Sequence, residues 1–551
     1  MLKLNKISII ILLLIFTLVV ASPSWSAVEM SNTGGEYRFG QVKAVPRPLQ
    51  WRVLKTPHFE IFFYQGLEEL ALRAREILEE EAFGRVFPDF RDFYTLYPYR
   101  KNRVILFASR KEYQNSQASG VPLFDSSEGV AHILINRLVI ITQPTFRDLR
   151  GVLTHEITHL ITIGPFKNNL LSQLSAGVPG WIAEGLAEFY MPEETRFALR
   201  EVALRDAVLR ETIDSLEQIS EVRGNLHYAE AWSLVDYIVR HHDKEILPQL
   251  LKGVINRGNN DQVFEEILGC TRKELWQNWK NELPQIYYEG AELPSFTAVN
   301  APLFKDYGDQ VKVKVARDGK VAFLSNFEGR IYGLYLDDGK KIKSLTDLTV
   351  SAFDFSPDGK EIVFLSDQSG ERKLYLLNLE TGQETPFALE LPNPVEVAWS
   401  PCGERLAVAV NTKGDSDLYL VDLKGKILGS IACSPKDETS PAWSPSGEKV
   451  AYVSPVQGYD QIYIWDGKSN ELLTRSGSHH REPVWGEDGR LYCLYGKQGY
   501  YQPVVINSED GKLSFPGNFQ ETVLEILPEA DSNFLLIIFN AGRSRIYRFQ
   551  S

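Results

Sequence analysis

The feature that most constrains the fold is a turn motif that recurs through the second half of the chain. Its clearest copies read Ser-Pro-x-Gly after a Trp or Phe, and strand-like segments follow them. The anchoring glycines lie 40, 44, 44 and 42 positions apart, at Gly319, Gly359, Gly403, Gly447 and Gly489. Self-similarity at such a period predicts that one small β unit is stacked repeatedly.

In the repeated motif, Pro fixes φ and the following Gly can adopt a positive φ, so the turn chemistry fits a β-hairpin. A spacing of 40 to 44 residues is typical of the blades of a β-propeller. A degenerate last copy around residues 527–539 gives six units, and we predict a six-bladed propeller over residues 300–551. A β-sandwich or an open array is the alternative. The aromatic anchors are expected to pack between blades, namely Trp399, Trp443 and Trp485.

The first half of the chain has a different pattern, and the change marks a domain boundary near residue 295. Strand-like alternation occurs at residues 59–64, 103–108 and 129–142. Helical periods cover residues 67–83 and most of 193–287. We therefore predict a multidomain protein in which an α+β domain, residues 51–292, precedes the propeller.

The most informative stretch for chemistry is H-E-x-x-H at residues 155–159, within a helical segment that we expect to run from 146 to 163. Residues four apart share a helix face, so His155 and His159 can direct two ring nitrogens at one point. Zinc binds neutral imidazole nitrogen. Glu156, beside the two histidines, is placed to take a proton from a zinc-bound water.

A catalytic zinc needs a third protein ligand and one position left open for water. Glu184 is the best candidate, because it follows His159 by 25 residues on a second predicted helix that begins near Pro179. Glu188 lies one turn further on the same face. It can accept a hydrogen bond from a ligand histidine and fix the orientation of that ring. The alternative is that both carboxylates form a solvated helix edge.

These motifs resemble two known families. H-E-x-x-H followed by W-x-x-E-G-x-A-E, here residues 181–188, resembles the gluzincin metallopeptidases, and in particular the peptidase MA-like domain of exported bacterial proteins. This resemblance covers roughly residues 50–290. The W-S-P-D-G repeats resemble TolB-like or PD40 propellers, which are WD40-like, over roughly residues 300–551.

The gluzincin resemblance implies peptide hydrolysis with Zn²⁺ as cofactor. It implies that Glu184 is the third zinc ligand and that Glu156 takes the water proton and later delivers it to the leaving amine. It also implies that a strand edge beside the zinc helix, here residues 129–136, pairs with the extended substrate. The glycine-rich or acidic exopeptidase signature often found at this edge is replaced by Glu-Gly-Val-Ala-His, so we predict an endopeptidase rather than an aminopeptidase.

Gluzincins often use a Tyr or His on a later helix to stabilise the developing oxyanion. The candidate here is Tyr228, ahead of His227, at the point where we expect a helix over residues 228–241 to open. The alternative is that Tyr228 is a packed aromatic residue at the helix start.

The N-terminus predicts export. Lys3 and Lys6 precede an apolar run of roughly 15 residues, and small residues follow it, as in a secretory signal peptide. We predict a signal peptide at residues 1–27, cleaved after Ala21, Ser26 or Ala27, and a lead-in at residues 28–50. An uncleaved anchor helix is the alternative. We expect no further membrane span, because no other stretch is long and apolar enough.

The formal net charge of −13 argues against a nucleic-acid partner and against binding to an anionic membrane surface. We therefore predict an exported zinc endopeptidase of the secreted or cell-envelope compartment, whose propeller binds a peptide or protein substrate or an envelope protein partner. The role of the propeller rests on fold analogy alone. Two alternatives stay open: a catalytically inactive envelope scaffold, and a hydrolase of the same fold that acts on a non-peptide amide.

Overall fold

The computed structural model describes residues 49–95, 99–110, 112–113, 129–133, 136–166, 177–195, 198–222, 224–288, 302–329, 332–367, 371–412, 414–508, 510–514, 519, 521–529 and 533–550. The signal peptide predicted at residues 1–27 and nearly all of the lead-in lie outside these ranges. Within the described part of the chain, no helix has both the length and the apolar character needed to cross a bilayer. Residues 49–551 form one compact unit.

The first domain contains a mixed five-stranded sheet with β4 as its last strand. In spatial order the strands are β1 (Trp51–Lys55), β2 (Phe59–Tyr64), β3 (Asn102–Phe107), β5 (Arg137–Ile141) and β4 (Gly129–His132). The pairs β2–β3 and β3–β5 are parallel, whereas β1–β2 and β4–β5 are antiparallel. The alternating Phe59, Ile61 and Phe63 are buried, as their strand pattern predicts.

The segment expected to be one helix at residues 67–83 is longer and less regular. It consists of α3 (Glu68–Glu76), the π-helical turn η2 (Ile77–Phe83) and α4 (Gly84–Phe90). The helix with the H-E-x-x-H motif is α6 (Phe146–Thr162). It packs against β4, β5 and η2 and buries Leu153, Ile157 and Ile161.

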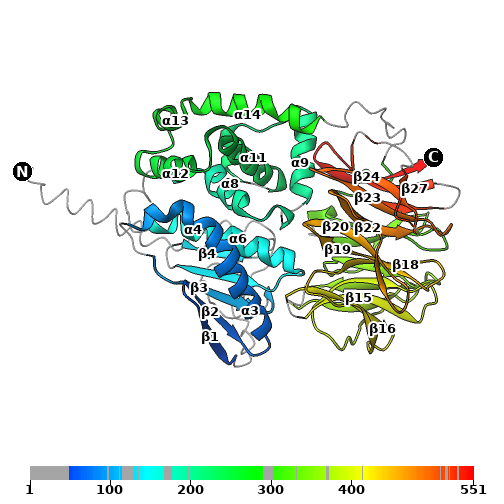
Figure 1. The fold of residues 1–551 in the computed structure, drawn as a ribbon. Helices are drawn as coiled ribbons and strands as arrows, with labels where there is room; N and C mark the ends of the chain where they lie inside the picture. The colour runs from blue at the N-terminus through cyan, green and yellow to red at the C-terminus, as the bar shows by residue number, and fades with distance from the viewer. Residues whose placement is uncertain are drawn as a thin grey trace, which may run out of the picture. The chain divides into compact units, whose positions relative to one another are not determined.

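The remaining helices of this domain form a layer on the other side of α6 from the sheet (Figure 1). They are α8 (Gly180–Tyr190), α9 (Ala198–Leu209), α10 (Leu216–Ser220), α11 (Gly224–His242), α12 (Ile246–Arg257), α13 (Asp261–Leu268) and α14 (Arg272–Tyr287). The helix expected at 193–210 is represented by the short η6 (Glu193–Thr195) and by α9.

The second domain contains six antiparallel sheets, each built from strands that are consecutive in sequence. The first is β6 (Gln310–Val315), β7 (Val321–Ser325), β8 (Gly333–Asp337) and β9 (Ile342–Ser344). The second is β10 (Ala352–Phe355), β11 (Glu361–Ser366), β12 (Lys373–Asn378) and β13 (Glu384–Pro386). The third is β14 (Pro394–Trp399), β15 (Arg405–Asn411), β16 (Ser416–Asp422) and β17 (Ile427–Ala432).

The last three sheets follow the same order. The fourth is β18 (Thr439–Trp443), β19 (Val450–Val456), β20 (Tyr459–Trp465) and β21 (Asn470–Leu472). The fifth is β22 (His479–Trp485), β23 (Leu491–Lys497), β24 (Tyr500–Ile506) and β25 (Leu513–Ser514). The sixth is β26 (Thr522–Pro528), β27 (Asn533–Asn540) and β28 (Arg543–Gln550). The predicted fold class, an α+β domain followed by a six-bladed propeller, is confirmed.

The repeated motif forms the hairpin between the first two strands of a blade, as predicted. In the third blade, Gly403 has φ +79° and its N–H donates to the carbonyl of Ser400. Trp399, from the same turn, belongs to one buried apolar cluster with Val363 and Leu374 of the preceding blade. The motif therefore serves both as a turn and as an anchor between blades.

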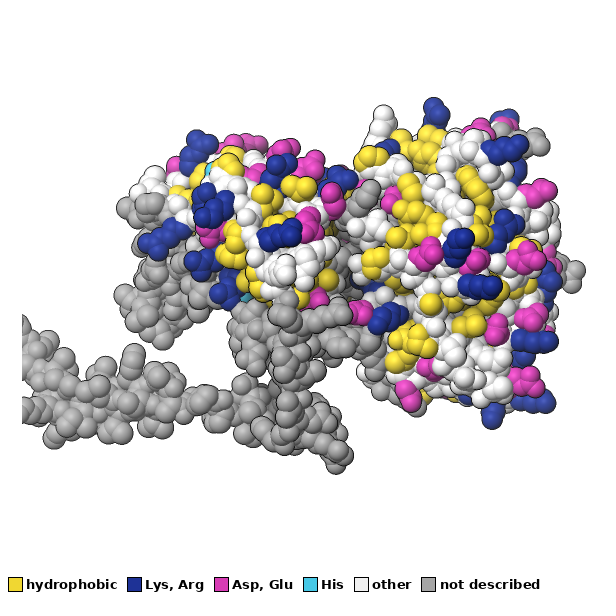
Figure 2. All heavy atoms as spheres, turned by 90° about the horizontal axis from the view of Figure 1, so that it is seen from below, with side chains coloured by type: hydrophobic (Ala, Val, Ile, Leu, Met, Phe, Trp, Pro, Cys, Tyr) yellow, Lys and Arg dark blue, Asp and Glu magenta, His cyan; other side chains and the backbone are white. Residues whose placement is uncertain are grey.

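The surface seen from below carries acidic and basic side chains interspersed with apolar ones (Figure 2).

Candidate metal centre

Residues at both ends of α6 account for its bounds. Thr145 accepts a hydrogen bond from the backbone N–H of Asp148, which is the contact of an N-cap residue. The other end closes with a hydrogen bond from the N–H of Ile163 to the carbonyl of His159, before Gly164. Because the buried apolar residues anchor one face of α6 in the core, the opposite face presents the H-E-x-x-H side chains to α8.

α8 packs closely against α11 at Gly185, next to Glu184. A Cβ at Gly185 would lie 2.5 Å from the carbonyl oxygen of Ala231, so only glycine fits there. This explains the Gly of the E-G-x-A segment in steric terms. With its backbone held in this way, α8 directs the Glu184 carboxylate at the two histidines of α6.

Three candidate ligand atoms surround one position at which a single ion could bind. Nε2 of His155 lies 3.1 Å from Oε2 of Glu184 and 3.3 Å from Nε2 of His159, and the remaining separation, from His159 to Glu184, is 3.5 Å. Ligand atoms about 2.0–2.1 Å from a tetrahedral zinc lie roughly 3.3–3.4 Å from one another. The three atoms therefore fit a tetrahedral site with one position left for water.

The electrostatics of this group favour a cation. Burial lowers the pKa of His155, but its hydrogen bonds to the carboxylates of Glu184 and Glu188 outweigh burial and raise the pKa to about 10. Burial raises the pKa of Glu184, yet His159 and His155 hold it well below its usual range. A site that binds a proton this strongly can bind a divalent cation in its place, with release of that proton.

Glu188 contacts His155 on the other side of its ring. Oε1 of Glu188 lies 3.0 Å from Nδ1 of His155, and the Glu188 side chain is buried. This is the contact that orients a metal-ligating histidine and fixes its tautomer. The same oxygen contacts the guanidinium of Arg200 on α9. Arg200 carries no motif, so the sequence could only indicate that a buried carboxylate needs some partner.

The edge strand β4 approaches α6 beside Glu156. A Cβ at Gly129 would lie 2.8 Å from Val152 and 3.3 Å from Cγ of Glu156, so glycine permits the close approach. β4 pairs with β5 on one side only and is the outermost strand of the described sheet. Its other edge is therefore suited to pair with an added peptide strand.

Tyr228 lies at the site, whereas His227 does not. The Tyr228 ring centre is 6.1 Å from that of His155, and the Arg200 guanidinium lies 4.4 Å from the Tyr228 ring centre. Burial, followed by the charge of Glu184, raises the pKa of Tyr228 to about 12. His227 points away, and its Nε2 lies 3.0 Å from Oδ2 of Asp214.

The expected start of this helix was wrong. α11 begins at Gly224, so His227 and Tyr228 lie inside it rather than at its first position. A second group of possible ligands occurs here, formed by Asp214, His227 and Glu230. Its carboxylate Glu230 is fully buried, and burial raises its pKa to about 8. A carboxyl group that is largely neutral at pH 7 makes this group a weaker cation site than the one on α6.

Two family models match the chain, one for each domain. Residues 106–285 match the Peptidase MA superfamily, and residues 312–545 match the TolB beta propeller domain. A peptidase MA-like domain is followed by a TolB-like propeller. The predicted family resemblance is therefore confirmed for both halves of the chain.

The chain is also similar, at low identity, to solved structures. TolB from Acinetobacter baumannii is 19% identical, with 50% of this chain and 70% of that chain covered and a TM-score of 0.31. The beta-propeller domain of the Trilobed protease from Pyrococcus furiosus is 14% identical, with 44% and 95% covered and a TM-score of 0.33. A comparison with curated proteins found no match.

Proposed function

We propose that this protein is an exported zinc-dependent endopeptidase. The observation that carries the proposal is the convergence of His155, His159 and Glu184, whose ligand atoms lie 3.1–3.5 Å apart. The match to the Peptidase MA superfamily supports a peptidase-like protein. Two nitrogens and one carboxylate oxygen, with a further carboxylate on Nδ1 of His155, are the donor set expected of a catalytic zinc.

His155, His159 and Glu184 would hold the zinc ion, which would supply Lewis-acid polarisation of the scissile carbonyl and of the attacking water. Glu156 accepts the proton of that water and then donates it to the leaving amine. Tyr228, whose ring centre lies 6.1 Å from that of His155, donates a hydrogen bond to the developing oxyanion. The outer edge of β4 binds the substrate backbone in an extended conformation.

We further infer that residues 1–27 are a signal peptide that directs the protein to the cell envelope or the medium. In this view residues 51–292 act as the peptidase and residues 300–551 as the propeller, which binds a protein substrate or an envelope partner. The TolB-like character of the propeller supports an envelope setting.

The test combines metal analysis with cleavage of a peptide library by the purified protein and by Glu156→Gln. We expect zinc in both proteins and cleavage only by the wild type. Glu265→Gln, which changes an exposed carboxylate on α13, serves as the matched control and should cleave normally. If the wild type binds zinc but cleaves no peptide, the inactive-scaffold alternative or a non-peptide amide substrate takes the place of this proposal.

A further inference from the structure

A side chain of the propeller accepts hydrogen bonds from the first backbone N–H groups of α6. Thr145 satisfies the N–H of Asp148, but the first two helical N–H groups, of Phe146 and Arg147, need other acceptors. Both donate to the carboxylate of Asp437 in the propeller, at 2.8 and 3.0 Å. A carboxylate at this position also interacts favourably with the helix dipole. The N-terminus of the helix that carries both histidines is therefore capped by a propeller side chain.

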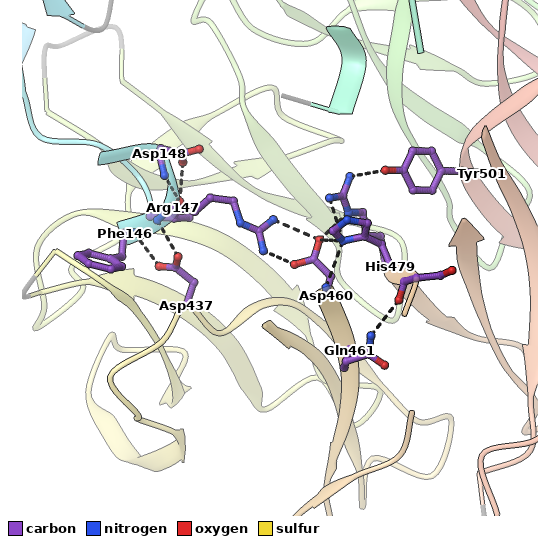
Figure 3. A network of polar contacts seen from close by, with 11 residues as sticks. Phe146, Arg147, Asp148, Asp437, Asp460, Gln461, His479 and Tyr501 are labelled. Carbon is purple, nitrogen blue, oxygen red and sulfur yellow. Dashed lines mark hydrogen bonds and ion pairs between the residues drawn. The ribbon is translucent and has the colours of Figure 1, made fainter. Parts of the chain in front are cut away.

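A buried ion-pair network continues from the same turn into the propeller (Figure 3). Nη1 of Arg147 lies 3.2 Å from the carboxylate of Asp460, and Nη2 contacts its other oxygen. Nε of Arg481 donates to Asp460 at 2.5 Å, and Nη1 of Arg481 donates to the hydroxyl of Tyr501 at 3.1 Å. Burial raises the pKa of Asp460, but the two arginines hold it well below its usual range. Arg147 of α6 thus compensates, together with Arg481, the negative charge of Asp460 in the propeller.

The helix α9 forms a second contact with the propeller. Val202 is buried and packs in one apolar cluster with Tyr501, whose hydroxyl belongs to the network just described. The carboxylate of Asp206 accepts hydrogen bonds from the backbone N–H groups of Ala541 and Gly542, at 3.1 and 2.9 Å. Blades five and six therefore hold α9 by apolar packing and by main-chain hydrogen bonds.

Both contacted helices set the geometry of the metal centre. α6 carries two of the three candidate ligands, His155 and His159. α9 carries Arg200, which contacts Glu188, and Glu188 in turn contacts Nδ1 of His155. The propeller is thus connected to the imidazole of His155 through two separate helices, α6 and α9.

We infer that the propeller positions the metal centre, and that Asp437 and Asp460 are positioning residues for zinc binding. This inference rests on the proposed function. His155 is nine residues after Phe146, which is about 13–14 Å along a helix that transmits tilt and rotation from its first turn. Ligand distances in a metal site must hold to about 0.2 Å. Loss of the Asp437 contact should therefore change the distances among the three ligand atoms.

The first test compares Asp437→Asn with Asp422→Asn. Asp422 also accepts two backbone hydrogen bonds, from Lys424 and Lys426, but within a turn of the third blade. We expect the zinc Kd, measured by chelator competition, to rise about tenfold in Asp437→Asn and to stay unchanged in Asp422→Asn. The visible absorption of the Co²⁺-substituted protein should change in the same variant only. Equal Kd values and equal spectra would overturn the inference.

The second test uses the wild type and so does not depend on a variant that folds. Coupling between two sites is reciprocal, so zinc must stabilise the interface if the interface stabilises the zinc site. We expect zinc to slow amide hydrogen exchange about fivefold or more at residues 437–441 and 479–482, and also in α9. Slowing confined to α6 and α8 would overturn the inference.

The outcomes separate this inference from the proposed function. Zinc binding by the wild type without peptide cleavage overturns the proposed peptidase activity and leaves the positioning role intact. Zinc binding with cleavage, but with equal affinity in Asp437→Asn, overturns the positioning role alone. A wild type that binds no zinc overturns both.

Discussion

Glu188 lies 3.0 Å from Nδ1 of His155, on the side of the ring opposite the candidate ligand nitrogen. With Glu188 at Nδ1, Nε2 is the ring nitrogen that faces Glu184 and His159. Glu188 is 1% exposed, so its charge is compensated by protein groups, His155 and Arg200, rather than by water. The candidate metal centre therefore has two layers, the three candidate ligands and the groups that contact them, and the outer layer can be tested separately.

We expect Glu188→Gln to weaken zinc binding by roughly 10- to 100-fold, because the histidine loses the partner that orients it. Chelator competition measures the Kd. Glu265→Gln on α13 is the matched control and should bind zinc as the wild type does. An unchanged Kd in Glu188→Gln would show that α6 alone orients the imidazole.

A side chain at position 129 should separate β4 from α6. Gly129→Val places methyl groups where Val152 and Ile140 already lie within 2.9 Å of an ideal Cβ. We expect a loss of about 1–3 kcal/mol in the free energy of unfolding and a lower kcat/KM for peptides, with zinc affinity unchanged. Gly177→Ala, where nothing lies within 4 Å, is the control for denaturant titration and kinetics. Full activity in Gly129→Val would remove the role of β4 in substrate binding.

Tyr228→Phe removes a hydroxyl and little else. If Tyr228 stabilises the oxyanion, kcat should fall about 10²- to 10³-fold while KM and zinc Kd change little. His227→Gln is the comparison, since His227 contacts Asp214 and points away from the site. A loss of kcat in His227→Gln that equals the loss in Tyr228→Phe would argue against a specific role for the hydroxyl.

Glu525 in the sixth blade predicts a pH-dependent stability. Burial raises the pKa of Glu525 to about 7 although Lys312 opposes the effect, so the folded state keeps its proton at a pH where the unfolded chain has lost it. The contribution of Glu525 to stability should therefore fall as pH rises from about 4.5 to 7 and then level off, by roughly 3–4 kcal/mol in all.

Glu525→Gln should reduce this pH dependence by the contribution of Glu525, because the amide keeps an acceptor for the N–H of Val313 without a charge. The part due to Glu230 should remain. Urea titrations at pH 5 and pH 8 measure the difference. Glu384→Gln, at an exposed position of β13, is the control and should keep the wild-type profile. A wild-type protein equally stable at both pH values would contradict the prediction.

Features that depend on local chemistry were predictable from the sequence. The Pro and Gly of the repeated turn, and the helical spacing that brings His155 to His159 and Glu184 to Glu188, are properties of short segments. The start of α11 was not predictable, because Gly224, Asn225 and His227 are weak helix formers and packing against α8 overrides this preference. The contact of Arg200 with Glu188 and that of Asp437 with the start of α6 were missed for a related reason. Both join parts of the chain that only the tertiary structure brings together.

The Asp437 contact with α6 also has a consequence for the timing of biosynthesis. Asp437 is 291 residues further along the chain than Phe146, so it leaves the ribosome roughly 15–60 s later at ordinary rates of synthesis. During that interval the first N–H groups of α6 lack their acceptor. We therefore expect the candidate metal site to reach its final geometry only after the segment around Asp437, just before the fourth blade, has been synthesised and has folded.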